Sequence, residues 1–203
     1  MKLVLTGGPS GGKTTLAQAI QKEFTGQVIV IPEAATIIYG GGWPRRKTSI
    51  GVQHQQRAIF YVQRELESLL ASENRDKLLI CDRGSLDGIA YWPGPGPGSE
   101  FLSSVGTTVE AEVARYDWVI HLDTAPVSYY DLTNPLRNES FEEASKLNEK
   151  IKEVWASHPQ RFVIDNHESG HFIEKLQRAL LVVERIIEGR SYAEIQSELL
   201  SDP

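Results

Sequence analysis

Residues 7–14 read Gly7-Gly8-Pro9-Ser10-Gly11-Gly12-Lys13-Thr14. An apolar run at 2–6 precedes them, and an amphipathic stretch at 14–20 follows. Glycines let backbone N–H groups turn inward around phosphate oxygens, and the next helix points its positive end at the same place. The spacing G-x-x-x-x-G-K-[ST] between a strand and a helix therefore predicts a phosphate-binding loop. The alternative is a glycine-rich turn that only caps a helix.

This loop predicts a bound nucleoside triphosphate with Mg²⁺. We expect Lys13 to reach the β- and γ-phosphates and the hydroxyl of Thr14 to ligate Mg²⁺, so the expected cofactors are ATP and Mg²⁺. The loop contacts phosphates and not the base, so it does not separate ATP from GTP. The residues expected to bind the nucleotide are Gly7, Gly8, Pro9, Ser10, Gly11, Gly12, Lys13, Thr14 and Thr15.

Length and composition indicate one globular domain. The 203 residues are 40% hydrophobic and 24% charged, which is ordinary for such a domain. The net charge of −6 provides no basic field for nucleic acid, so a nucleic-acid partner is not expected. Cys81 is the single cysteine and excludes an internal disulfide. No apolar run approaches the roughly 20 residues of a membrane span, and we expect a cytoplasmic protein without a membrane partner.

Apolar runs alternate with helical patterns along the chain. The strands are predicted at 2–6, 27–31, 77–81, 116–122 and 161–164. The helices are predicted at 13–24, 53–73, 139–156, 171–188 and 192–200. Between them, residues 91–98 contain a run at 93–98 that alternates proline and glycine, which predicts a loop. Continuous apolar strands separated by helices favour a parallel sheet that is covered on both faces, with ligands at the carboxyl ends of its strands.

One carboxylate follows the third predicted strand directly. Asp82 comes after the apolar residues 78–81, and a carboxylate at a strand tip beside a phosphate loop can hold Mg²⁺. The alternative is an aspartate that caps the next helix. Asp123 follows a similar apolar run at 119–122 and competes for the same role.

Two further stretches carry a resemblance. They read Asp82-Arg83-Gly84-Ser85-Leu86-Asp87-Gly88-Ile89-Ala90-Tyr91 and Leu122-Asp123-Thr124-Ala125-Pro126. Together with the phosphate loop they make residues 1–188 resemble the nucleoside and nucleotide kinases of the P-loop superfamily. That group includes thymidylate kinase, the deoxynucleoside kinases and small kinase-like ATPase domains similar to ribosylnicotinamide kinase. The resemblance implies a structural role for Asp123 and leaves Asp82 as the partner of Mg²⁺.

The fold that follows is of the α/β class. We expect a three-layer α/β/α P-loop NTPase fold with a five-stranded parallel sheet in the kinase-type strand order. Residues 1–190 would form this domain, with a lid segment near 127–157. Residues 191–203 would form a short C-terminal helix.

The resemblance also implies an acceptor side. In deoxynucleoside kinases a glutamate after the second strand contacts the acceptor hydroxyl and acts as its base, and Glu33 stands there. A carboxylate that faces the γ-phosphate can accept or orient a hydroxyl proton. The alternative is a solvent-exposed glutamate at a helix start. Arg137 in the lid would neutralise charge on the transferred group, and Arg83 would share this work. An exposed pair with a neighbouring glutamate would explain Arg137 equally well.

Five more residues are candidates for acceptor binding. Arg45 and Arg46 lie in a loop after three glycines and could grip an anionic acceptor, or they belong to a solvated loop. Gln53 and Gln56 lie one helical turn apart, and Arg57 follows them. In deoxynucleoside kinases a glutamine on this helix reads the base edge, a task that suits an amide because it both donates and accepts. The alternative is the polar surface of an amphipathic helix.

Three functions remain compatible with the sequence. The first is an ATP- and Mg²⁺-dependent phosphotransferase that moves the γ-phosphate to a hydroxyl of a small, nucleoside- or nucleotide-like acceptor. The second is a kinase-fold ATPase that acts as a nucleotide-dependent switch, and the third is a kinase of an antibiotic or a macromolecule. The absence of an N-K-x-D motif argues against a GTPase, and the chain length argues against an AAA+ motor. A homodimer is left open.

Overall fold

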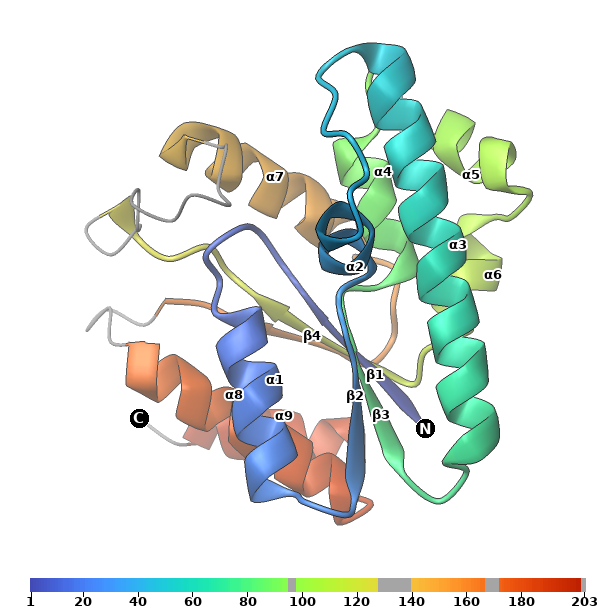
Figure 1. Cartoon of the computed structure of the whole chain (residues 1–203). Helices are drawn as coiled ribbons and strands as arrows, with labels where there is room; N and C mark the ends of the chain where they lie inside the picture. The colour runs from blue at the N-terminus through green and yellow to red at the C-terminus, as the bar shows by residue number, and fades with distance from the viewer. Residues whose placement is uncertain (95–97, 128–139, 167–171, 202–203) are drawn as a thin grey trace.

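A single parallel sheet organises the molecule. The computed structural model describes residues 1–94, 98–127, 140–166 and 172–201. The strands are β1 (Lys2–Thr6), β2 (Val28–Ile31), β3 (Leu78–Asp82), β4 (Trp118–Leu122) and β5 (Arg161–Ile164). They lie in the order β2-β3-β1-β4-β5, so β1, which leads into residues 7–14, sits in the centre of the sheet (Figure 1). The predicted α/β fold with a five-stranded parallel sheet is confirmed.

Helices cover both faces of this sheet and make three layers (Figure 1). One face carries α1 (Lys13–Glu23), α8 (Phe172–Ile187) and α9 (Tyr192–Ser201). The other carries α3 (Ser49–Glu73), α4 (Gly88–Tyr91), α5 (Ser99–Val105), α6 (Val109–Val113) and α7 (Phe141–Val154). Successive side chains of a strand point to opposite faces. Leu3 and Leu5 therefore enter the first core, whereas Val4 enters the second.

Several short elements differ from the expectation. The helix α2 (Ala34–Gly40), the 3₁₀ turn η1 (Ser85–Asp87) and α4 to α6 were not predicted, because segments this short carry little periodicity. Helix α3 begins at Ser49, four residues before the predicted start. The side chain of Thr48 explains this difference, because it accepts a hydrogen bond from the N–H of Gly51 at 3.3 Å and caps the helix.

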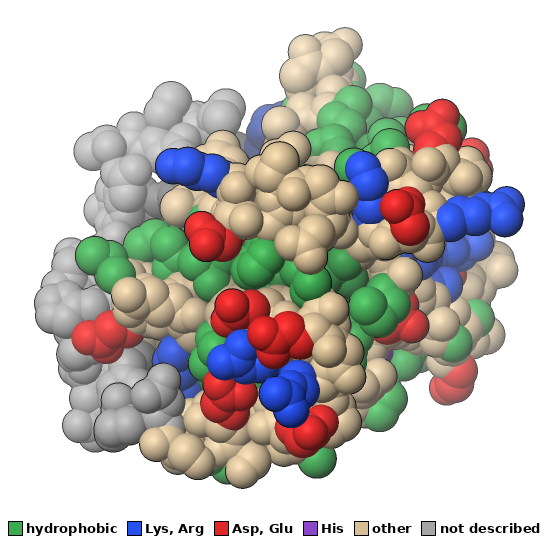
Figure 2. All heavy atoms as spheres, turned by 90° about the horizontal axis from the view of Figure 1, so that it is seen from below, with side chains coloured by type: hydrophobic (Ala, Val, Ile, Leu, Met, Phe, Trp, Pro, Cys, Tyr) green, Lys and Arg blue, Asp and Glu red, His purple; other side chains and the backbone are tan. Residues whose placement is uncertain are grey.

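The surface of the described residues is mixed in charge. Figure 2 shows acidic and basic side chains interleaved on the face seen from below. Within the described ranges, no helix combines the length and the apolar character needed to cross a membrane.

Candidate active site

The phosphate loop leaves β1 at the carboxyl edge of the sheet and packs against the end of β4. Gly7 has a φ of 120°, and a Cβ on this residue would lie 2.0 Å from the carbonyl oxygen of Leu122. Only glycine fits this approach. Ser10 also has a positive φ, of 61°, so the loop turns back toward the start of α1. The predicted strand–loop–helix context of residues 7–14 is therefore present.

Lys13 lies buried inside its own loop. Its Nζ donates hydrogen bonds to the carbonyl oxygens of Gly7 at 3.0 Å and Gly8 at 2.7 Å. Burial lowers the pKa of Lys13 to about 7, and the charge of Arg83 acts in the same direction. A polyanion at the loop would relieve this penalty, because it would supply the negative charge that the buried ammonium lacks.

Thr14 and Asp82 bring two oxygen atoms together at the start of α1. Thr14 Oγ1 lies 3.4 Å from Asp82 Oδ2 in a long hydrogen bond. Asp82 is the last residue of β3, and burial raises the pKa of its carboxyl group even though Lys13 opposes the shift. Among the residues that the structure describes, no group of three His, Cys, Asp or Glu side chains could hold a metal. An oxygen pair of this kind suits Mg²⁺, which typically takes one or two protein ligands beside phosphate and water.

Arg83 connects the phosphate loop with Glu33. Its Nε donates to Glu33 Oε1 at 2.7 Å, and its Nη1 donates to the carbonyl oxygen of Gly7 at 3.3 Å. The second oxygen of Glu33 accepts from Thr36 Oγ1 at 2.6 Å. Burial alone would raise the pKa of Glu33, but the Arg83 charge and the Thr36 hydroxyl hold it below the usual value. Two residues predicted from separate segments thus share one ion pair.

Two aromatic side chains, Tyr91 and Trp92, lie between this cluster and α3 and contact arginines on both sides. The guanidinium of Arg83 lies 5.7 Å from the ring centre of Tyr91, and that of Arg57 lies 6.0 Å from the ring of Trp92. Because Tyr91 and Trp92 are consecutive, the two arginines flank neighbouring positions of the same segment. Arg57, one of the candidates for acceptor binding, therefore contacts the ring of Trp92.

The two predicted glutamines lie on α3, outside the ion pair of Arg83 and Glu33. Gln56 is buried and Gln53 half-buried, and among the described residues neither is hydrogen-bonded to Arg83 or Glu33. The amide of Gln55, which was not predicted, accepts from the backbone N–H of Arg46 at 2.9 Å and donates to its carbonyl oxygen at 3.2 Å. Gln55 thus holds the loop before α3.

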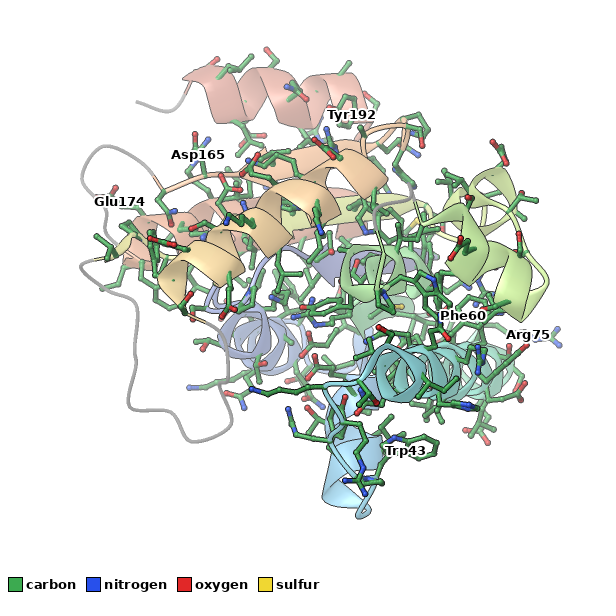
Figure 3. All side chains as sticks on the ribbon, turned by 90° about the horizontal axis from the view of Figure 1, so that it is seen from above. Trp43, Phe60, Arg75, Asp165, Glu174 and Tyr192 are labelled. Carbon is green, nitrogen blue, oxygen red and sulfur yellow. The ribbon has the colours of Figure 1, made fainter. Side chains whose placement is uncertain are left out.

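Arg45 and Arg46 belong to the loop between α2 and α3, and their contacts lie within that region. The guanidinium of Arg45 stacks 4.0 Å from the ring centre of Tyr39, and Arg46 is held through its backbone by Gln55. In Figure 3 the nearby Trp43 lies at the outer end of the connection between α2 and α3, away from the sheet. Arg137 lies outside the described residues.

Two residues of this region were missed by sequence reasoning. Asp87 accepts from Arg83 Nη1 at 3.2 Å and is buried. Asn148 of α7 accepts from the backbone N–H groups of Gly8 at 3.0 Å and Thr124 at 3.3 Å. Both are polar residues within mainly apolar or amphipathic segments, which is the one signal that could have drawn attention to them.

Asn148 also explains the role of Asp123. Its Nδ2 donates to Asp123 Oδ1 at 2.8 Å, and Lys152 Nζ lies 2.9 Å from the same oxygen. Burial alone would raise the pKa of Asp123, but the hydrogen bonds from His121, Asn148 and Lys152 hold it well below the usual range. Asp123 therefore ties the end of β4 to α7, as a structural residue does.

Solved structures of similar fold include three nucleotide or nucleoside kinases. A thymidylate kinase from Ehrlichia chaffeensis matches with a TM-score of 0.59 at 15% identity, over 92% of this chain and 98% of that one. A deoxyadenosine kinase from M. mycoides with bound dATP matches with a TM-score of 0.62 at 15% identity, over 92% and 99%. A thymidylate kinase from Candida albicans matches with a TM-score of 0.59 at 14% identity, over 93% and 91%. At these identities the likeness establishes the fold.

Sequence comparison identifies the family of the chain. No curated protein sequence matches this chain. A family model described as an AAA domain matches residues 2–175, which include the phosphate loop, Asp82 and all five strands. The chain therefore belongs to this AAA domain family, and its sheet has the architecture of the P-loop nucleotide kinases.

Proposed function

We propose that the protein is a phosphotransferase that uses ATP and Mg²⁺ to phosphorylate a hydroxyl group of a small, nucleoside- or nucleotide-like acceptor. One observation carries this proposal. Arg83 contacts both the carbonyl oxygen of Gly7 in the phosphate loop and the carboxylate of Glu33. A switch that only hydrolyses nucleotide has no need for an acceptor-side carboxylate beside the loop, whereas a kinase needs both.

The donor side would hold the triphosphate through backbone amides of the loop. Lys13 would leave the carbonyl oxygens of Gly7 and Gly8 and bind the phosphates, where its charge is better compensated. Thr14 and Asp82 would hold Mg²⁺, which when bound neutralises phosphate charge. These contacts would orient the γ-phosphoryl group for transfer, with Arg83 and Glu33 as the residues proposed to receive the acceptor.

The acceptor side would act mainly by orientation. The lowered pKa of Glu33 makes its carboxylate a weak base, so it is suited to accept a hydrogen bond from the acceptor hydroxyl and to take the proton late. Arg83 would stabilise negative charge on the transferred group. The rings of Tyr91 and Trp92, with Arg57, offer a surface on which a planar base could stack. The names of the similar kinases favour an acceptor of this class.

The test is ADP formation with a panel of nucleosides and nucleoside monophosphates in the presence of ATP and Mg²⁺. We expect at least one acceptor to raise the rate well above the rate without acceptor. Glu33→Gln should lower this acceptor-dependent rate by about 10²-fold while leaving ATP affinity unchanged. Glu65→Gln is the matched control, because Glu65 lies exposed on α3.

Three results would overturn the proposal or a part of it. A slow ADP release that no acceptor changes would favour the nucleotide-dependent switch. Full acceptor-dependent turnover in Glu33→Gln would remove Glu33 from the reaction. If only an antibiotic or a macromolecule raises the rate, the reaction is right and the acceptor class is wrong.

A further inference from the structure

Arg83 has an unusual backbone conformation. Its φ of 78° lies in the left-handed region, which residues other than glycine rarely adopt. Its backbone N–H donates to the carbonyl oxygen of Leu5 at 3.0 Å, and the N–H of Ser85 donates to the hydroxyl of Tyr116 at 3.0 Å. The backbone is thus held on both sides of the residue, and its side chain starts from a defined position.

Asp87 holds the far end of the same side chain. Its Oδ2 accepts from Arg83 Nη1 at 3.2 Å. Its Oδ1 accepts from Thr6 Oγ1 at 2.7 Å and from the indole Nε1 of Trp155 at 2.7 Å. Asp87 is only 3% exposed, so these three donors fix the carboxylate in one orientation. Glu33, the other carboxylate on Arg83, has a side chain that is 29% exposed and is less constrained.

Trp155 reaches this cluster from the end of α7, on the same face of the sheet. It follows the last residue of α7 and is fully buried. A Cβ on Gly84 would lie 2.4 Å from Cζ2 of Trp155, so the indole ring packs directly on the backbone beside Arg83. Trp155 therefore contacts both the backbone next to Arg83 and, through its N–H, the carboxylate that holds the guanidinium.

We propose that Asp87 and Trp155 are positioning residues that hold the Arg83 guanidinium between the Gly7 carbonyl and the Glu33 carboxylate. The catalytic value of this arrangement rests on the proposed function, but the arrangement itself can be tested without any substrate. Because Trp155 follows α7 directly, a movement of α7 would reach Arg83 through Asp87.

A packing role and a positioning role make different demands on Trp155. Packing requires the aromatic ring, whereas positioning requires the N–H that Asp87 accepts. Trp155→Phe keeps a ring and removes the donor. Asp87→Asn keeps the shape of the side chain but removes its charge, and its NH2 group would face at least one of the donors that the carboxylate accepts. Trp118→Phe is the matched control, because Trp118 is a buried tryptophan that stacks on Phe162 in the other core.

The experiment is proton-detected NMR of the ¹⁵N-labelled protein without nucleotide. The Nε–H signal of Arg83, identified by its loss in Arg83→Lys, should exchange slowly with solvent because Glu33 accepts it. Asp87→Asn and Trp155→Phe should speed this exchange by about tenfold or more, as expected when a bond to a charged group loses its support. Trp118→Phe should leave the exchange rate at the wild-type value.

The outcomes separate this proposal from the proposed function. An exchange rate in Asp87→Asn that equals the wild-type rate would overturn the positioning role, even if Trp155→Phe fails to fold. With an acceptor found as above, Asp87→Asn should lower kcat about tenfold and leave KM for ATP unchanged. If the wild-type protein shows no acceptor-dependent turnover, the proposed function fails, and the exchange rates still decide the positioning role.

Discussion

The two halves of the proposed site, a donor half and an acceptor half, differ in how they are built. The donor half comes from the contiguous residues 7–15 with Asp82 on the neighbouring strand, and Lys13 bonds within its own loop. The acceptor half joins Glu33, Arg83 and Arg57 from separate elements. A contiguous loop carries its geometry along the chain, whereas separate elements receive theirs from packing. Substitutions in the donor half should therefore affect nucleotide binding and turnover directly. Substitutions in other parts of the site should act through the packing that supports the donor half.

The largest expected effect is in the donor half. Lys13→Ala should lower ATP turnover by about 10³-fold. It removes the buried cation of the phosphate loop that would stabilise negative charge on the γ-phosphate during transfer. The measurement is ADP release together with calorimetric titration of ATP. Lys22→Ala, an exposed change on the same helix α1, should match the wild type. Turnover of Lys13→Ala within a few-fold of the wild type would refute the assignment of the loop.

A substitution of Asp82 tests whether Mg²⁺ binds in the donor half. Asp82→Asn should lower turnover by about 10²-fold and raise the Mg²⁺ concentration needed for half-maximal rate, because a neutral amide replaces the carboxylate beside Thr14. The measurement is the rate as a function of Mg²⁺ concentration at saturating ATP. Asp76→Asn in an exposed turn is the control. An unchanged Mg²⁺ dependence would show that Asp82 has only a structural role.

Asn148 tests how far the donor half depends on its support. Asn148→Ala should leave the buried N–H groups of Gly8 and Thr124 without their acceptor, at a cost of about 1–3 kcal/mol. We expect KM for ATP to rise about tenfold while turnover at saturation changes little. Steady-state kinetics at varied ATP measures this. Asn74→Ala at the end of α3 should leave KM unchanged, and the same result in Asn148→Ala would mean that the loop holds its shape alone.

The smallest expected effect is the uptake of a proton by Lys13 when ATP binds. The pKa of Lys13 is lowered to about 7, so this side chain is largely neutral in the free protein at pH 8. Bound phosphates favour the charged form, and binding at pH 8 should therefore take up close to one proton. At pH 6 Lys13 is already protonated and no uptake is expected. Affinity should accordingly fall as pH rises above 7.

Calorimetric titrations of ATP in two buffers of different ionisation enthalpy measure this uptake. Lys13→Arg keeps its charge at both pH values and should show none. A binding enthalpy for the wild type that is the same in both buffers at pH 8 would contradict the lowered pKa.

The sequence predicts most of the framework, because the signals for it are local. The apolar strands, the glycine loop and the longer helices each carry their own periodicity or spacing. The short elements α2 and α4 to α6 do not. Asp82 was found because it stands at the end of an apolar strand, where ligands gather in a parallel sheet, and Arg83 was found through the resemblance to the kinases.

The contacts that assemble the site could not be predicted from the sequence, for a physical reason. The ion pair between Glu33 and Arg83 spans 50 positions, and the bond between Asp87 and Trp155 spans 68. Nothing local to either partner specifies such a pair, because packing of the helices on the sheet decides it. The spacing of Gln53 and Gln56 shows the same limit. It predicts a shared helix face, but the amide that clamps the neighbouring loop belongs to Gln55.

The destination of the γ-phosphate tests the central claim most directly. The protein is incubated with ATP labelled in the γ-phosphate, Mg²⁺ and the acceptor panel, and the labelled products are separated. If the two halves form one kinase site, the label appears in an acceptor in proportion to the ADP released, and Glu33→Gln reduces this transfer. Label that appears only in inorganic phosphate, at a rate that no acceptor changes, would contradict the account.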